Sequence, residues 1–142
     1  MNTLIMGDAL YPYLPQIAKM IDDQLPEVEN VDQHQAIAIV SGEVAKAVVL
    51  YGDYTRFDLR MHIASVDQTW CQRGILRGCF SYPFNQLRVR RVTALVPKKN
   101  KHARRFNERL GFVHEGTHPQ SMADGGAMCS YGMVREKCKW IS

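Results

Sequence analysis

The segment spanning residues 88–116 constrains the fold of this chain more than any other. It holds an apolar run over Val92–Val96, a cationic stretch over Asn100–Leu110, and Gly111 directly before a further β-prone run. The apolar run predicts a buried strand, the cationic stretch a short helix, and the glycine its C-terminal end. A helix that begins beside a sheet presents free backbone N–H groups and a positive dipole end. The segment therefore predicts a strand–helix–strand unit that can face a phosphate-bearing ligand.

The rest of the chain predicts helices and strands in an irregular order within one domain, residues 1–142. Apolar spacing and turn residues predict helices over Tyr11–Leu25 and from Asp67–Thr69 to just before Pro83, and strands over Ala36–Val40, Ala45–Tyr51, Phe57–Ser65, Arg90–Val96, Phe112–Thr117 and Ala127–Arg135. An early antiparallel meander followed by strand–helix–strand units is typical of an α/β fold on a mixed sheet.

Charge is distributed unevenly along the chain. Residues 1–34 carry six acidic side chains against Lys19, whereas residues 88–109 carry nine basic side chains against Glu108. The basic segment suits a polyanion, either a nucleotide cofactor or a nucleic acid, although a solvated helix face explains it as well. Phe106 is the one aromatic residue among these bases, which argues against a single-stranded nucleic acid.

The cysteines and the hydropathy pattern give expectations about compartment and metals. The four cysteines form no Cys-x-x-Cys pair, so the sequence predicts reduced thiols, a cytoplasmic setting and no zinc site. No apolar run is long enough for a membrane helix, and no basic leader precedes an apolar stretch. His114 and His118 are four residues apart in a predicted strand and turn, where this spacing does not form a metal site.

The motif Asn100-x-x-Ala103, followed by Leu110-Gly111-Phe112-x-x-Glu115-Gly116, resembles the acetyl-CoA-binding core of the GNAT N-acetyltransferases. The resemblance covers roughly residues 34–135 and is greatest to small acetyltransferase-like proteins of phages and prophages, which end in a basic tail like Arg135–Trp140. It implies the GNAT fold, a mixed and mostly antiparallel sheet flanked by helices and splayed between the fourth and fifth strands. One N-terminal helix and the short first strand of that fold are not expected here.

The resemblance implies where acetyl-CoA would bind. The strand over Phe57–Ser65 would offer backbone groups to the pantetheine arm, and the following loop and helix start would surround the pyrophosphate. That loop, at Gln72-Arg73-Gly74-Ile75, departs from the family pattern because Leu76 stands where a second small residue is usual. The implied cofactor-binding residues are Ile63, Ala64, Ser65, Gln72, Arg73, Gly74, Ile75, Asn100, Ala103, Arg104 and Phe106.

Catalysis requires a group that takes a proton from the amine. His62 and Glu115 are alternative candidates for this base, and backbone N–H groups at Ile63–Ser65 for stabilising the oxyanion. Many relatives place a tyrosine at the position of Asn107, where it protonates the leaving thiolate. An asparagine does not do this, so Tyr131 on the last strand is the candidate replacement. Glu115 can equally pair with a neighbouring arginine, and Tyr131 can equally be a core residue.

The resemblance implies transfer of an acetyl group from acetyl-CoA to a primary amine, of a protein or a small molecule, by direct attack in a ternary complex. The alternative is a non-catalytic GNAT-fold protein of phage structure or host interaction, which Asn107 and the altered loop favour. The acidic stretch Asp22–Asp32 indicates a cationic amine acceptor, although a solvated acidic helix end explains it as well. A host protein is one candidate acceptor. The sequence leaves the oligomeric state open, a homodimer included.

Overall fold

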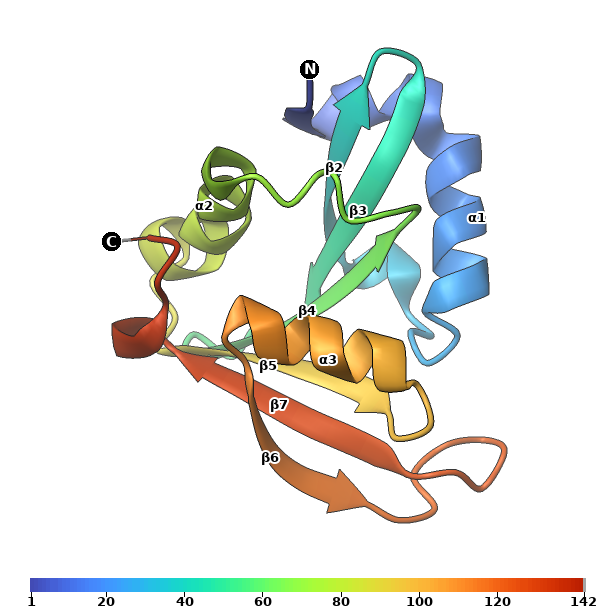
Figure 1. Cartoon of the computed structure of the whole chain (residues 1–142), viewed down its shortest axis with the longest axis vertical. Coiled ribbons are helices and arrows are strands. Elements are labelled where there is room, and N and C mark those ends of the chain that lie inside the picture. Colours follow the sequence, from blue (N-terminus) through green and yellow to red (C-terminus); the bar gives the residue numbers. More distant parts are fainter. Residues whose placement is uncertain (142) are drawn as a thin grey trace.

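The computed structural model describes residues 1–141, whose strands form one seven-stranded sheet in the order β1-β2-β3-β4-β5-β7-β6. Neighbouring strands are antiparallel except β4 and β5, which are parallel. The strands are β1 (Thr3–Met6), β2 (Gln35–Ser41), β3 (Val44–Gly52), β4 (Asp58–Ser65), β5 (Arg91–Pro97), β6 (Val113–His118) and β7 (Met128–Val134). In Figure 1 the first four strands and the last three fan apart from one another.

Helices cover both faces of the sheet. Helix α1 (Leu14–Gln24) packs its apolar side, including Ile17, on a cluster that contains Val48 and Ala64. Helices α2 (Arg73–Ser81) and α3 (Lys101–Leu110) lie on the opposite face, over a second cluster (Figure 1). Because side chains alternate along a strand, successive residues of β4 face α1 and the α2/α3 layer in turn.

The expected splay between the fourth and fifth strands of the family fold lies between β4 and β5. The two strands pair over three residues only, Asp58–Arg60 against Arg91–Thr93. Beyond Thr93 they separate, although β4 continues to Ser65 and β5 to Pro97. The sheet is therefore open between the C-terminal halves of these two strands.

Local residues define helix α3 as the sequence predicts. The Asn100 side chain accepts a hydrogen bond from the N–H of Ala103 (3.1 Å), which makes Asn100 the N-cap. Gly111 ends the helix with φ 113°, a left-handed conformation that favours glycine. The indole of Trp140 then donates to the free carbonyl of Leu110 (2.8 Å), so the C-terminal tail fixes this helix end.

One additional strand and the starts of two helices differ from the prediction. The chain does form the first strand, β1, which pairs with β2. The first helix begins at Leu14 after a 3-10 segment over Gly7–Tyr13, and the second at Arg73. The reason for the late start of α2 is that Asp67 accepts hydrogen bonds from the backbone and hydroxyl of Thr69 (2.9 and 2.6 Å), which closes a turn instead of capping a helix.

Within residues 1–141 the four cysteines are free, and no cluster of three or more metal-binding side chains occurs. None of the helices in this range is long and apolar enough to cross a membrane.

Candidate active site

A cleft of about 730 Å³ occupies the splay between β4 and β5. Its lining includes Ile63 of β4, Ala94 of β5 and Ala103 of α3 on the α3 face of the sheet, and His62 and Glu27 on the α1 face. Because residues from both faces line one cavity, the cleft passes between the strands from one side of the sheet to the other. Two ligands can therefore meet in it from opposite faces.

The backbone of β4 directs a free N–H group into this cleft. Val66 donates its N–H to Lys46 (2.9 Å), so the β3–β4 register makes residues 60, 62 and 64 pair their backbone groups with β3. The backbone N–H and C=O groups of the residues between them point toward β5. At Ser65 the side-chain amide of Gln24 hydrogen-bonds to both backbone groups: it donates to the carbonyl (2.8 Å) and accepts from the N–H (2.9 Å). The N–H of Ile63 consequently faces the space that β5 has left.

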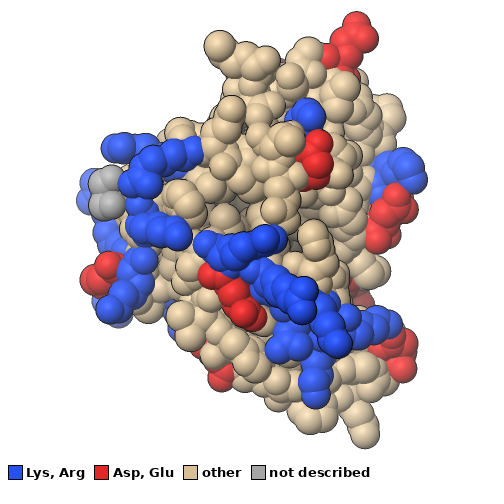
Figure 2. All heavy atoms as spheres, in the orientation of Figure 1, with Lys and Arg blue, Asp and Glu red and all other residues tan. Residues whose placement is uncertain are grey.

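The α3 side of the cleft is basic. Figure 2 shows lysine and arginine side chains gathered over α3, beside a hollow of the surface. A second hollow of about 430 Å³ there is lined by Ser65–Gln68, His102, Arg105 and Arg109. Arg109 donates to the side chain of Gln68 (3.4 Å), which joins α3 to the loop after β4. This surface suits the phosphates of an anionic ligand.

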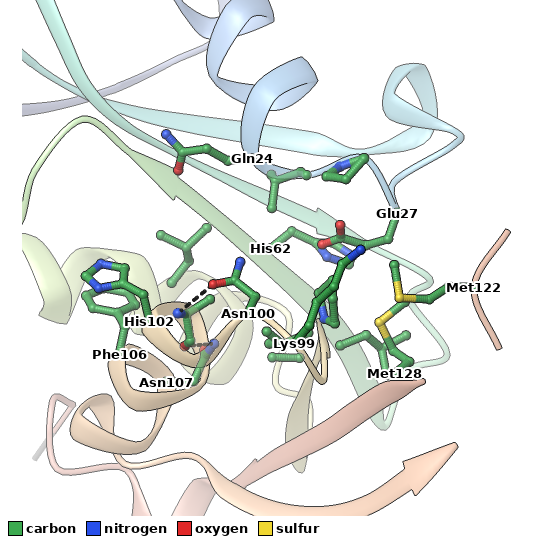
Figure 3. Close-up of a pocket in the computed structure, with 18 of the residues that line it drawn as sticks. Gln24, Glu27, His62, Lys99, Asn100, His102, Phe106, Asn107, Met122 and Met128 are labelled. Carbon is green, nitrogen blue, oxygen red and sulfur yellow. Dashed lines mark hydrogen bonds between the residues drawn. The ribbon is translucent and has the colours of Figure 1, made fainter. Parts of the chain in front are cut away.

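The α1 side of the cleft carries a half-buried carboxylate, Glu27, and a buried imidazole, His62. Oxygen Oε2 of Glu27 and Nδ1 of His62 are both buried without a hydrogen-bond partner among the described residues. Burial raises the pKa of the Glu27 carboxyl. Burial, followed by the neighbouring His34 and Arg60, lowers the pKa of His62 to about 4, so this imidazole is neutral at pH 7. Figure 3 shows both side chains bordering the cleft.

The predicted cofactor-binding residues divide into two groups. Ile63, Ser65, Asn100, Ala103 and Phe106 line the cleft.

The other predicted residues lie elsewhere. Ala64 faces α1 and is buried there, and Arg104 donates to the hydroxyl of Tyr131 (3.0 Å). Residues 72–75 form the start of α2 and line neither hollow. A Cβ built on Gly74 meets no atom within 4 Å, so space for a ligand remains above this glycine. Leu76, at the unusual position of the loop, is buried in the core and does not obstruct the cleft.

Of the three predicted catalytic residues, the structure brings only His62 into the cleft. Glu115 accepts hydrogen bonds from both terminal nitrogens of the Arg91 guanidinium (2.5 and 3.3 Å). This is the pairing with a neighbouring arginine that the sequence left open as the alternative to catalysis. Tyr131 is fully buried under α3 and donates its hydroxyl to Glu108 (3.1 Å). Burial raises the pKa of Tyr131. Neither Glu115 nor Tyr131 lines the cleft.

Asn107 lies where many relatives place a tyrosine, and it does line the cleft. Its amide donates to the carbonyl of Ala103 one turn earlier (3.0 Å), and the residue is 8 % exposed. The side chain is thus held by its own helix, and no acidic proton is available at this position.

Sequence reasoning missed Glu27 and Gln24 as site residues. Both lie in the acidic stretch Asp22–Asp32, which the sequence connected with a cationic acceptor without singling out either residue. Their place in the cleft depends on α1 packing across β4, which no local pattern specifies.

Comparisons with known proteins agree with this architecture. No protein-family model matches the sequence, and no curated protein matches it. Among solved structures, Ard1 from Thermoplasma volcanium superposes with a TM-score of 0.71 at 16% identity, over 94% of this chain and 97% of the other. Spermidine/spermine N-acetyltransferase SpeG from Vibrio cholerae gives 0.70 at 12% identity, over 96% of each chain. A structure described as a probable acetyltransferase gives 0.61 at 14% identity, over 87% and 70%. The GNAT fold predicted from the sequence is therefore confirmed.

Proposed function

We propose that this protein is an acetyl-CoA-dependent N-acetyltransferase that acts on a primary amine by direct attack in a ternary complex. The observation that carries the proposal is the cleft through the splayed sheet, with a basic surface on the α3 face and the half-buried Glu27 carboxylate on the α1 face. The opposite charges support entry of an anionic acetyl donor from one face and a cationic acceptor from the other.

The residues present fit acetyl-CoA as a substrate. The N–H of Ile63 is a free donor for an amide carbonyl of the pantetheine arm, as at the edge of a sheet. Ala103 and Phe106 give the arm an apolar wall on α3. Arg105, Arg109 and the start of α2 are the candidates for the phosphates, since the loop itself lacks the second small residue of the family pattern.

The chemistry joins the amine nitrogen to the acetyl carbon and breaks the bond from that carbon to sulfur. Glu27, whose pKa is raised by burial, is the group in the cleft that can accept the proton of the incoming amine, directly or through water. His62, the base that the sequence suggested, is a much weaker base because its pKa is lowered to about 4. A thiol has an ordinary pKa of about 8.5, so the thiolate is a competent leaving group without a donor at Asn107. The missing tyrosine therefore lowers the rate and does not prevent the reaction.

A thiol-release assay tests the proposal. Wild-type protein incubated with acetyl-CoA and a panel of primary amines is expected to release free CoA and to give an acetylated amine detected by mass spectrometry. Ala103→Trp fills the cleft and is expected to abolish this activity. Ala9→Trp, at an exposed residue outside the cleft, is the matched control and retains it. Equal activity in the two variants, with both folded, would place the reaction elsewhere.

Asn107 favours a second candidate, a protein that retains the fold and binds a partner without catalysis. The same assay separates the two, because this candidate predicts no free thiol with any amine or with host lysate as the acceptor. Sustained thiol release would eliminate it.

A further inference from the structure

The C-terminal tail, residues 135–141, passes from strand β7 to helix α2 beside the end of helix α3 (Figure 1). At its beginning, Arg135 donates a hydrogen bond to the side chain of Asn85 (3.0 Å), in the segment that follows α2. Near its end, Arg73, the first residue of α2, donates to the carbonyl of Lys139 (3.4 Å). The tail therefore runs along α2 from the C-terminal end of that helix to its N-terminal end.

The tail also holds helix α3. Cys138 is buried in the apolar cluster that α2 and α3 cover, and Trp140 packs against the same cluster. The indole nitrogen of Trp140 donates to the carbonyl of Leu110 (2.8 Å), the last residue of α3. A carbonyl at the end of a helix has no partner within that helix, so this hydrogen bond supplies one. The tail consequently joins the start of α2 to the end of α3.

Arg109, the residue before Leu110, belongs to the basic surface beside the cleft. It lines the hollow of about 430 Å³ together with Arg105, and it donates to the side chain of Gln68 (3.4 Å). Its guanidinium makes no ion pair within residues 1–141, so its charge is available to an anionic ligand. The position of the guanidinium depends on the backbone of the last helical turn, because helix ends open more easily than the middle.

Trp140 lines neither the cleft nor the smaller hollow. Its side chain can therefore influence a ligand there only through the residues that it holds. Leu110 is the residue whose carbonyl it binds, and Arg109 is the next residue along the helix. The contact of Arg73 with the tail connects this arrangement to the start of α2, where open space remains above Gly74. Both groups proposed for the phosphates are thus linked to one segment of the chain.

We infer that Trp140 is a positioning residue for the acetyl donor: its hydrogen bond to Leu110 holds Arg109 where the guanidinium meets the phosphates. This inference rests on the proposed function and adds a residue to its donor site. Because Trp140 touches neither hollow, it contributes to the binding of the donor and not to the transfer of the acetyl group.

Calorimetric titration of the full-length protein with CoA tests the inference. Trp140→Phe keeps an aromatic ring and removes the N–H donor, and it is expected to weaken CoA binding roughly fivefold, the effect of one hydrogen bond. Tyr13→Phe is the matched control, since it removes a hydroxyl that donates to the carbonyl of Gly42 (2.6 Å) far from α3. The control is expected to bind CoA as the wild type does. Equal weakening in the two folded variants would show a general loss of stability and overturn the inference.

A double-mutant cycle shows whether Trp140 acts through Arg109. Arg109→Gln is expected to weaken CoA binding roughly tenfold, the effect of losing a hydrogen bond to a charged group. Adding Trp140→Phe to Arg109→Gln is expected to weaken it by less than about twofold more, because residues that act through one contact are not additive. A full fivefold effect of Trp140→Phe in the Arg109→Gln background overturns the inference.

Two other results of these titrations would also overturn the inference. One is CoA binding by Trp140→Phe that equals that of the wild type, and the other is CoA binding by Arg109→Gln that equals it. In both cases the wild type still binds CoA, and the proposed function stands. If the wild type itself does not bind CoA, the proposed function fails together with the inference, so the two failures are distinguishable.

Discussion

Replacing His62 with glutamine is expected to make the protein less sensitive to acid. His62 is 8 % exposed, and its ring lies 5.7 Å from the ring of His34, centroid to centroid. Burial first, then His34 and Arg60, lower the pKa of His62 to about 4, with Asp53 opposing them. The unfolded chain has a histidine pKa near 6.5. The folded state therefore binds this proton less readily than the unfolded state does.

The sign and size of the effect follow from these two pKa values. Above pH 6.5 both states hold a neutral His62, and the residue adds no pH dependence. As the pH falls from 6.5 to 4, only the unfolded state gains the proton, so stability is lost. The loss attributable to His62 is about 1.4 kcal/mol at pH 5.5 and about 3 kcal/mol at pH 4.

Urea unfolding at pH 7.5, 5.5 and 4.0 measures this loss directly. Between pH 7.5 and 4.0, His62→Gln should lose about 3 kcal/mol less free energy of unfolding than the wild type loses. His102→Gln, at an exposed histidine, is the control and should follow the wild type. Identical acid sensitivity in His62→Gln and wild type would refute the argument that His62 is buried in its neutral form.

Three further substitutions test the assignments of the site. Asn100→Ala removes the cap on the Ala103 N–H and should cost about 1 kcal/mol of stability in urea unfolding, whereas Asn100→Asp should not. Glu115→Gln weakens a partly exposed ion pair with Arg91, so it should lower the free energy of unfolding by less than about 1 kcal/mol and leave the KM for acetyl-CoA unchanged. A raised KM would show that Glu115 contributes to the binding of acetyl-CoA. Tyr131→Phe should cost about 1 kcal/mol and leave kcat within about twofold; a selective kcat loss would identify it as the acid instead.

The parts of the fold that the sequence predicted are those with local determinants. Helix α3 has its cap at Asn100 and its glycine end at Gly111 within a few residues of each other, and both predictions are confirmed. Strand β1 was not expected because it has only four residues and exists through its pairing with β2. Asp67 indicated a helix start, but its side chain closes a turn with Thr69, and sequence alone does not distinguish these two uses of a carboxylate.

The site was harder to predict because its residues converge through tertiary packing. Ile63 and Ala64 are neighbours in sequence, yet alternation along β4 places Ile63 on the α3 face, where it lines the cleft, and Ala64 in the core under α1. The sequence left Glu115 open as a catalytic base or as an ion-pair partner. In the sheet, β7 lies between β5 and β6, and Arg91 of β5 reaches across β7 to pair with Glu115 of β6. Glu27 enters the cleft only because α1 ends beside the splay, which is a property of the whole fold.

A crystal structure of the protein grown with acetyl-CoA is the most direct test of the central claim, that the opening between β4 and β5 receives the acetyl donor. The account predicts density for the pantetheine arm beside Ile63, with the phosphates over Arg105 and Arg109. Density for the donor at any other surface, or an empty cleft at a saturating concentration, would contradict it.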